Sequence, residues 1–332
     1  MTTYRSHAGA GGSPARLAVW ASAWTGALIL SSVACGQTVP AQTVPGHAVA
    51  AHQPVPAAAH PAPAPIPGTV PPGMQYLYGS GEAAAISVQA WHALVAFVEQ
   101  QKALQFRAAG TRTGVVLEQG STLDAPVFQR CGFKPFAVVF DVDETVLLNL
   151  GFEGDDAAHP GRAYDQKRWD AWERTGVADV APTPGAKEAL AALRGMAVTV
   201  VFNTNRSARN AQATQAALDG AGLGPARHGD TLYLSGDDAT GSRKDARRAA
   251  IAARFCVVAM AGDQLGDFSD LFNAPGLSVV ARRAATMAAP IARLWGAGWF
   301  VLPNPVYGTA LKGGVDDVFP ADRRWGAAKD GD

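Results

Sequence analysis

Runs of consecutive apolar residues alternate with amphipathic stretches in the second half of the chain. The run Phe-Ala-Val-Val-Phe at residues 136–140 has no polar position. A run of this kind is typical of a strand that is buried on both faces of a parallel sheet. Further runs of this kind lie at residues 198–202, 231–234 and 255–261, and residues 276–281 and 299–302 could add one or two more strands.

The stretches between these runs predict helices. Apolar positions recur at helical spacing, or helix-start signals occur, at residues 75–101, 186–193, 210–218 and 243–254. In the first of these, Trp91, Leu94, Val95 and Val98 form a stripe that can pack on a core. Strands that alternate with helices predict parallel βαβ units, so we expect an α/β fold with a doubly wound, mostly parallel sheet. Ligands of such sheets bind beyond the carboxyl ends of the strands.

Carboxylates follow two of the predicted strands directly. Asp141 and Asp143 come after the strand at residues 136–140, and Asp263 and Asp267 come after the strand at residues 255–261. Carboxylates that converge on one site repel each other unless a cation lies between them. Oxygen ligands from a few carboxylates and a substrate phosphate suit Mg²⁺, so we expect Mg²⁺ or another divalent cation here.

The two remaining predicted strands lead to groups that can bind phosphate. Thr204 and Asn205 follow the strand at residues 198–202, and Lys244 opens the helix after the third strand. Phosphoryl transfer needs a nucleophile, a metal, a cationic clamp and an acid for the leaving oxygen. An aspartate nucleophile, Asp141, would form an aspartyl-phosphate. The alternatives are that the acids are solvated turn or cap residues and that Lys244 is a surface lysine.

The order of these motifs resembles the haloacid dehalogenase (HAD) superfamily. The run Asp-Val-Asp-Glu-Thr, with Glu144 as its fourth residue, is similar to the class C bacterial acid phosphatases, a family of outer-membrane lipoprotein 5′-nucleotidases. The similarity covers roughly residues 75–310. It includes YGSGEAAA (78–85), YDQKRWDAW (164–172), PTPGAKEAL (182–190), FNTNR (202–206), KDARR (244–248), GDQLGDF (262–268) and PNPVYG (303–308).

The resemblance implies roles for individual residues and a small helical cap at about residues 149–182. By resemblance to this family, Asp141 would be the nucleophile, and Asp143 would be the general acid and base, with its backbone carbonyl binding the metal. Asp263 and Asp267 would complete the metal site. Thr204 and Lys244 would bind the phosphate, and Phe152 and Tyr307 would lie beside a nucleobase. Two positions depart from the family pattern. Leu148 stands where the family usually has Asp, and Gln264 stands where it usually has Asn.

The N-terminal region predicts export. Two basic residues precede an uncharged apolar run that ends in small residues, so residues 1–35 are typical of a signal peptide. An uncleaved membrane anchor is the alternative. Ser-Val-Ala-Cys at residues 32–35 resembles a lipobox, and both a lipid anchor at Cys35 and ordinary cleavage near Ala34 stay open. We expect a periplasmic or outer-membrane location.

Composition divides the rest of the chain. Residues 36–74 hold ten prolines and no charged residue, so they predict an extended tether. A phosphatase domain over residues 75–315 and a tail over residues 316–332 would follow. The formal net charge is zero, without a Lys/Arg block, which argues against a nucleic-acid partner. Cys131 and Cys256 can pair in an oxidising compartment, or both can be buried thiols.

Taken together, the motifs and the resemblance predict a metal-dependent acid phosphatase. Its substrate would be a small phosphomonoester, with 5′-nucleotides as the first expectation. A sugar-phosphate phosphatase or a phosphotransferase on the same core is one alternative. A surface lipoprotein that binds a ligand without turnover is another, but it leaves the set of acids unexplained. The sequence does not indicate an oligomeric state.

Overall fold

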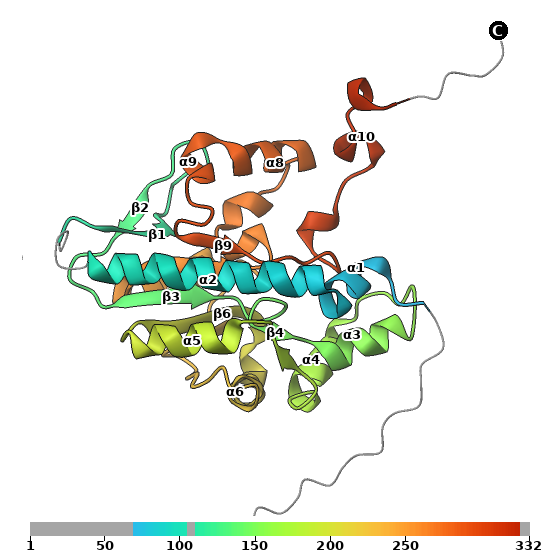
Figure 1. Cartoon of the computed structure of the whole chain (residues 1–332), viewed down its shortest axis with the longest axis horizontal. Helices are drawn as coiled ribbons and strands as arrows, with labels where there is room; N and C mark the ends of the chain where they lie inside the picture. The colour runs from blue at the N-terminus through green and yellow to red at the C-terminus, as the bar shows by residue number, and fades with distance from the viewer. Residues whose placement is uncertain (1–68, 105–109, 326–332) are drawn as a thin grey trace, which may run out of the picture. The chain divides into compact units, whose positions relative to one another are not determined.

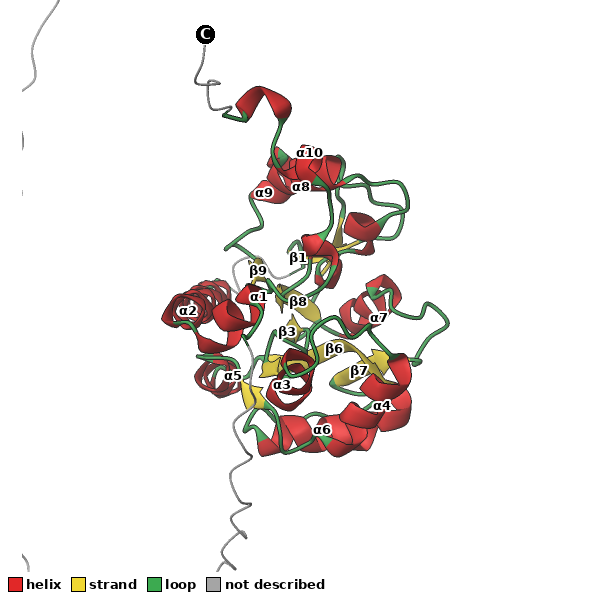
Figure 2. Cartoon of the chain, turned by 90° about the vertical axis from the view of Figure 1, so that its right-hand side faces the viewer, coloured by secondary structure: helices red, strands yellow, loops and turns green. Residues whose placement is uncertain are grey.

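A five-stranded parallel sheet lies at the centre of the part of the chain that the computed structural model describes, residues 69–104 and 110–325. Its strands follow the order β7-β6-β3-β8-β9. Figure 1 labels β3, β6 and β9 of this sheet, and Figure 2 labels all five strands. They are β3 (Phe136–Phe140), β6 (Thr199–Ser207), β7 (Leu232–Ser235), β8 (Cys256–Gly262) and β9 (Trp299–Val301). The predicted α/β fold with a parallel sheet is therefore confirmed.

One of the weaker apolar runs does not form a strand. The helix α8 (Val279–Met287) begins within residues 276–281, and the hydroxyl of Ser278 caps it by accepting from the backbone N–H of Ala281 at 3.1 Å. Val280 is 56% exposed, so this run does not belong to the core. A helix forms here in spite of the apolar pattern, because the Ser side chain at the N-cap accepts a hydrogen bond from a free N–H of the first helical turn.

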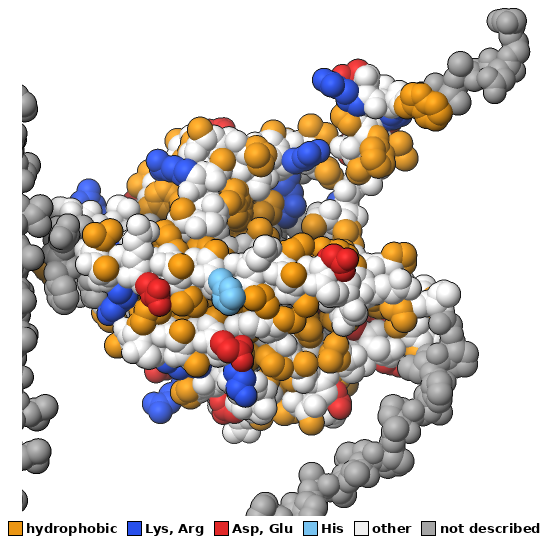
Figure 3. Space-filling model, in the orientation of Figure 1, with side chains coloured by type: hydrophobic (Ala, Val, Ile, Leu, Met, Phe, Trp, Pro, Cys, Tyr) orange, Lys and Arg blue, Asp and Glu red, His pale blue; other side chains and the backbone are white. Residues whose placement is uncertain are grey.

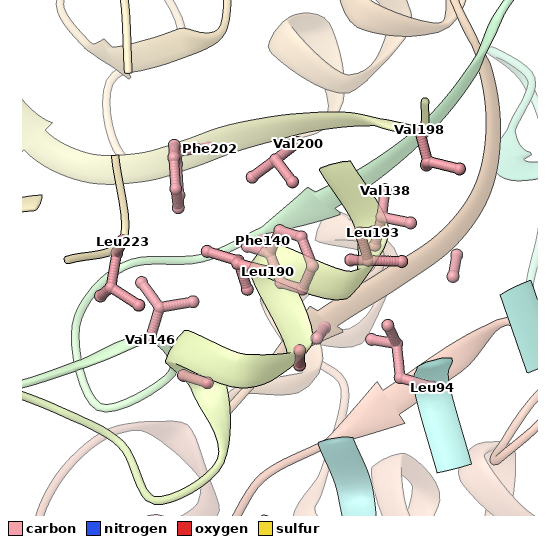
Figure 4. Packing of buried hydrophobic residues seen from close by; sticks show 14 of the residues in the cluster. Leu94, Val138, Phe140, Val146, Leu190, Leu193, Val198, Val200, Phe202 and Leu223 are labelled. Atoms are coloured by element: carbon pink, nitrogen blue, oxygen red, sulfur yellow. The ribbon is translucent and has the colours of Figure 1, made fainter. Parts of the chain in front are cut away.

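Helices cover both faces of the sheet (Figure 2). On one side lie α2 (Gly81–Ala103), α5 (Ala186–Gly195) and α6 (Ala211–Gly220), and on the other lies α7 (Asp245–Arg254). Alternate residues of β3 pack on the two faces of the sheet, because successive side chains of a strand point to opposite faces. Val138 and Phe140 pack with α2, α5 and α6 (Figure 4), whereas Ala137 and Val139 pack with α7.

The strand order places a switch point at β3. The chain runs outward from β3 to β6 and β7, and then returns to β8 on the other side of β3. Asp141 follows β3 and Asp263 follows β8, and the backbone N–H of Asp141 still donates to the carbonyl of Ala261 at 3.0 Å. The first and last acidic motifs therefore lie side by side, at the point where such folds bind their ligands.

A helical insert follows β3 and covers this end of the sheet. The short strand β4 (Leu147–Leu148) pairs with β5 (Ala181–Pro182), and between them lie α3 (Leu150–Ala157) and α4 (Gln166–Thr175). The ring of Phe152 packs edge-on against Trp169, with 4.9 Å between the ring centroids. We call residues 149–180 the cap.

The N-terminal part of the domain leads into a long core helix. The turn α1 (Pro72–Met74) and the π-helical turn η1 (Gln75–Gly79) precede α2. By length and composition α2 could cross a membrane, but its Trp91, Leu94 and Val98 are buried in the core and Figure 3 shows a mixed polar and apolar outer surface. The predicted signal peptide with Cys35, and the predicted tether up to residue 68, lie outside the described residues.

A disulfide joins Cys131 and Cys256 across 125 residues of sequence, which settles a choice that the spacing left open. It ties β8 to the end of the antiparallel hairpin of β1 (Thr113–Leu117) and β2 (Phe128–Arg130), which the apolar pattern did not predict. The remaining elements are η2 (Ala208–Asn210), η3 (Leu265–Asp267), η4 (Asp270–Asn273), α9 (Ala289–Ala292), η5 (Thr309–Leu311), α10 (Val315–Val318) and η6 (Ala321–Arg323).

Candidate active site

A cavity of about 900 Å³ opens at the carboxyl ends of the strands, below the cap. Its volume lies in the range that is usual for small-molecule sites. The four acids and the lysine that the sequence predicted for the site all line this cavity: Asp141, Asp143, Lys244, Asp263 and Asp267. Asn205 lines it too, so all four strand-end motifs meet in one cavity.

Asp141 and Lys244 form the centre of the site. The ammonium Nζ of Lys244 lies 2.5 Å from Oδ1 of Asp141 and 2.6 Å from Oδ1 of Asp267. Burial opposes the charge of Lys244, but the two carboxylates raise its pKa. Lys244 stands at the N-cap of α7, where the carboxylate of Asp270 accepts its backbone N–H at 2.9 Å. The helix start therefore fixes the cation beside the nucleophile candidate.

The acids around Lys244 fit a divalent cation. One carboxylate oxygen from each of Asp141, Asp263 and Asp267 lies within 4.8 Å of the others, and all three residues are buried. Three carboxylates and one ammonium leave a net charge of −2. Burial raises the pKa of Asp141 well above its ordinary value and that of Asp263 to about 6. Hard oxygen ligands with excess negative charge are what Mg²⁺ requires.

Asp143 lies apart from this carboxylate cluster. Arg206 holds it, with Nε donating to Oδ1 at 2.8 Å, and Asn149 donates to the same oxygen at 3.0 Å. Arg206 is itself 1% exposed and also donates to Asn149 at 2.8 Å. No motif in the sequence pointed to a role for Arg206, although it follows Asn205 directly. It orients Asp143 as a buried guanidinium can, with a planar set of donors.

Thr204 and Asn205 lie within β6, which is longer than the apolar run predicted. Thr204 is fully buried, accepts the backbone N–H of Arg206 at 3.1 Å, and has its hydroxyl 3.5 Å from Oδ2 of Asp143. Asn205 lines the cavity, and its Oδ1 accepts from Arg247 at 2.9 Å. Thr204 thus supports Asp143, while Asn205 is open to a ligand.

A second buried guanidinium shapes the loop that carries Asp263 and Asp267. Arg248 of α7 donates to the backbone carbonyls of Gly266 and Asp267 at 3.0 and 2.9 Å. Asn304 donates to Oδ2 of Asp263 at 2.7 Å. Arg248 and Asn304 come from two separate motifs of the sequence, KDARR and PNPVYG. They hold the acids in place without neutralising them, because each donates to a backbone carbonyl or through a neutral amide.

Glu144 faces away from the cluster into a buried polar pocket. It has a left-handed backbone (φ 51°) and accepts hydrogen bonds from the hydroxyls of Tyr307 and Tyr78, the latter at 3.2 Å. The backbone N–H of Asn149 donates to it at 3.0 Å. Burial, with the charge of Asp143, raises the pKa of Glu144 to about 8. Glu144 thus anchors the loop that carries Asp141 and Asp143.

The aromatic residues differ in what they present to the cavity. Phe152 lines it but is only 6% exposed, because Arg168 lies 4.0 Å above its ring and Trp169 packs on its edge. Tyr307 lines the cavity with its hydroxyl engaged, and Tyr164 and Trp169 line it from the cap. The packing leaves Phe152 less ring surface for a ligand than the family resemblance implied.

Comparison with known proteins matches residues 97–310 to a family model described as "HAD superfamily, subfamily IIIB (Acid phosphatase)". Two similar solved structures are those of the class C acid phosphatase from Bacillus anthracis, one of them with tungstate bound. They are 22% and 24% identical, with TM-scores of 0.55 and 0.54, and each match covers 72% of this chain and 84% of the other. At this identity the likeness shows the fold. No curated protein matches the sequence.

Proposed function

The chain belongs to the acid phosphatases of HAD subfamily IIIB and is a phosphomonoester hydrolase, and from that premise we propose that it works through an aspartyl-phosphate on Asp141. The observation that carries the proposal is the position of Asp141. Its carboxylate contacts the ammonium of Lys244 and has an oxygen within 4.8 Å of carboxylate oxygens of Asp263 and Asp267. Asp143 is held separately by Arg206.

The first step is transfer of the phosphoryl group. A carboxylate oxygen of Asp141 forms a bond to phosphorus while the bond from phosphorus to the leaving oxygen breaks. Asp143, in its protonated form, gives its proton to the leaving alkoxide. Arg206 and Asn149 fix the orientation of Asp143 for this transfer. Lys244 lowers the repulsion between the nucleophile and the anionic phosphoryl group.

The second step is hydrolysis. Asp143, now a carboxylate, takes a proton from water as the water oxygen attacks phosphorus, and the bond from phosphorus to Asp141 breaks. Inorganic phosphate leaves and both carboxyls return to their starting states. Asp141, Asp263 and Asp267, with the backbone carbonyl of Asp143, would hold Mg²⁺. When bound, the cation supplies the positive charge that the cluster lacks.

The cavity supports a substrate with a sizeable leaving group, and we propose 5′-nucleotides. The rings of Tyr164, Trp169 and Tyr307 line the walls above the acids, and aromatic faces suit a nucleobase. We also propose that the protein is exported, to the periplasm or the outer membrane, with Cys35 as a candidate lipid anchor. The disulfide supports export, because disulfides persist in oxidising compartments.

Phosphate release from p-nitrophenyl phosphate, 5′-nucleotides and sugar phosphates tests these proposals, with Mg²⁺ and with a chelator. Asp141→Asn should lower turnover roughly a thousandfold or more while leaving the fold intact. Asp124→Asn, an exposed aspartate between β1 and β2, is the matched control and should keep full activity. An Asp141→Asn variant with near-normal turnover, or full activity in chelator, would contradict the proposed mechanism.

A further inference from the structure

Glu153 is a buried carboxylate without a partner in the described part of the chain. It lies on α3 in the cap, lines the cavity and is 6% exposed. Among the described residues, no side chain or backbone group donates a hydrogen bond to its carboxylate or forms an ion pair with it. The nearby cation Arg168 is engaged elsewhere, with Asp155 at 2.8 Å and Asp156 at 2.7 Å.

Such an arrangement is unfavourable unless something else satisfies the carboxylate. Buried polar groups are almost always hydrogen-bonded, and a buried charge is normally paired. Burial, together with the charge of Asp156, raises the pKa of Glu153 to about 7, although Arg168 lowers it. The remaining open direction is the cavity, so a bound ligand can supply the missing donor.

The charges around Glu153 indicate what kind of ligand fits. The cap side of the cavity also carries Asp156 and Asp170, and one cation, Arg162, lines this side among the described residues. Arg162 already forms an ion pair with Asp155 at 2.6 Å. Asp156 is likewise paired, with Arg168 at 2.7 Å, whereas Glu153 and Asp170 form no ion pair among the described residues. Two carboxylates without a cationic partner make this wall acidic. A leaving group with extra phosphates would be repelled, whereas hydroxyl groups can donate to a carboxylate.

We propose that Glu153 is a specificity-determining residue that accepts a hydrogen bond from a hydroxyl group of the leaving alcohol. It also discriminates against leaving groups with additional negative charge. The inference rests on the proposed hydrolysis of phosphomonoesters at Asp141. It assigns the substrate class more narrowly, as monophosphates of hydroxyl-bearing alcohols such as nucleosides.

Four substrates separate these effects in the presence of Mg²⁺. They are a nucleoside 5′-monophosphate, its 2′,3′-dideoxy analogue, the nucleoside 5′-diphosphate and p-nitrophenyl phosphate. The wild-type protein should prefer the ribonucleotide to the dideoxy analogue in kcat/KM by about 10–100-fold, the range for a hydrogen bond to a charged group. Glu153→Ala should abolish this preference and change kcat/KM for p-nitrophenyl phosphate by less than about twofold.

Glu153→Gln separates charge from hydrogen bonding. The amide still accepts from a hydroxyl, so part of the preference for the ribonucleotide should remain, while relative activity on the diphosphate should rise by about 5–10-fold. The thermal midpoint should stay equal or rise, since an unpaired buried charge is removed. Glu188→Gln, on the exposed side of α5, is the matched control and should change none of these values.

The outcomes distinguish this inference from the proposed function. A uniform loss on all four substrates, an unchanged preference in Glu153→Ala, or a clearly lower midpoint in Glu153→Gln would overturn the role of Glu153 alone. In each of these cases the wild-type protein still hydrolyses p-nitrophenyl phosphate. A wild-type protein that hydrolyses none of the four would overturn the proposed function and the inference with it.

Discussion

Replacing Lys244 by methionine should separate the two proposed tasks of the carboxylate cluster, which are metal binding and phosphoryl transfer. At an effective dielectric constant of about 20, the contacts of Lys244 with Asp141 and Asp267, at 2.5 and 2.6 Å, each correspond to about 6 kcal/mol of attraction before desolvation. The net loss from removing one partner of a buried pair is smaller, about 3–5 kcal/mol. Without Mg²⁺ the variant should therefore be less stable by about this amount.

The same substitution changes the cluster charge from −2 to −3, so Mg²⁺ should bind more tightly. We expect the half-saturating Mg²⁺ concentration to fall while kcat/KM at saturating Mg²⁺ drops by about 10²–10³, as for the loss of one electrostatic group that stabilises a transition state. Thermal unfolding and initial rates across a Mg²⁺ titration measure both effects. Lys187→Met, on the exposed side of α5, serves as the control. A higher half-saturating concentration, or unchanged kcat/KM, would refute the placement of Lys244.

Three further perturbations bear on the site and the fold. Burial raises the pKa of Asp263 to about 6 in the folded protein, whereas an unfolded aspartate titrates near pH 4. The metal-free protein should therefore lose stability as the pH rises from about 4 to 6, and Mg²⁺ should restore the stability most above pH 6. Thermal scans in which Mg²⁺ stabilises the protein more at pH 4 would contradict this. Removing the disulfide between Cys131 and Cys256, which closes a loop of 125 residues, should lower the unfolding free energy by about 2–5 kcal/mol, measured by urea denaturation, and an unchanged midpoint would argue against the bond. Arg206→Gln should lower kcat by about 10²-fold with little change in KM, because Asp143 loses the donors that orient it, and an unchanged kcat would exclude this positioning role.

The central sheet could be predicted because its strands are continuous apolar runs buried on both faces. Elements with weaker patterns could not. The hairpin of β1 and β2 has mixed polarity, and residues 276–281 look like a strand although Ser278 starts a helix there. The end of β6 also lies beyond its apolar run, since polar residues continue the strand into the cavity. The spacing of apolar residues indicates which side chains are buried. It therefore does not reveal strands or helix N-termini that are held by polar contacts.

The acids of the site could be predicted from their place after the strands, but their supports could not. Arg206 and Arg248 are buried, whereas composition alone favours an exposed position for arginine. Glu144 meets Tyr78 and Tyr307 across 66 and 163 residues of sequence, so no local pattern links them. Glu153 has no hydrogen-bond or ion-pair partner within residues 69–104 and 110–325, so no paired motif pointed to it. Only the three-dimensional arrangement shows that its carboxylate faces the substrate cavity.

The proposed aspartyl-phosphate can be observed most directly in the variant Asp143→Asn. p-Nitrophenolate leaves without a protonating acid, whereas hydrolysis of the intermediate needs Asp143, so the phosphorylated protein should accumulate. Rapid mixing with ³²P-labelled p-nitrophenyl phosphate should give a burst of about one p-nitrophenolate per site, and the label should map to the peptide with Asp141 and be released by hydroxylamine. Release of p-nitrophenolate without label on the protein, or label on another residue, would contradict the role of Asp141 as nucleophile.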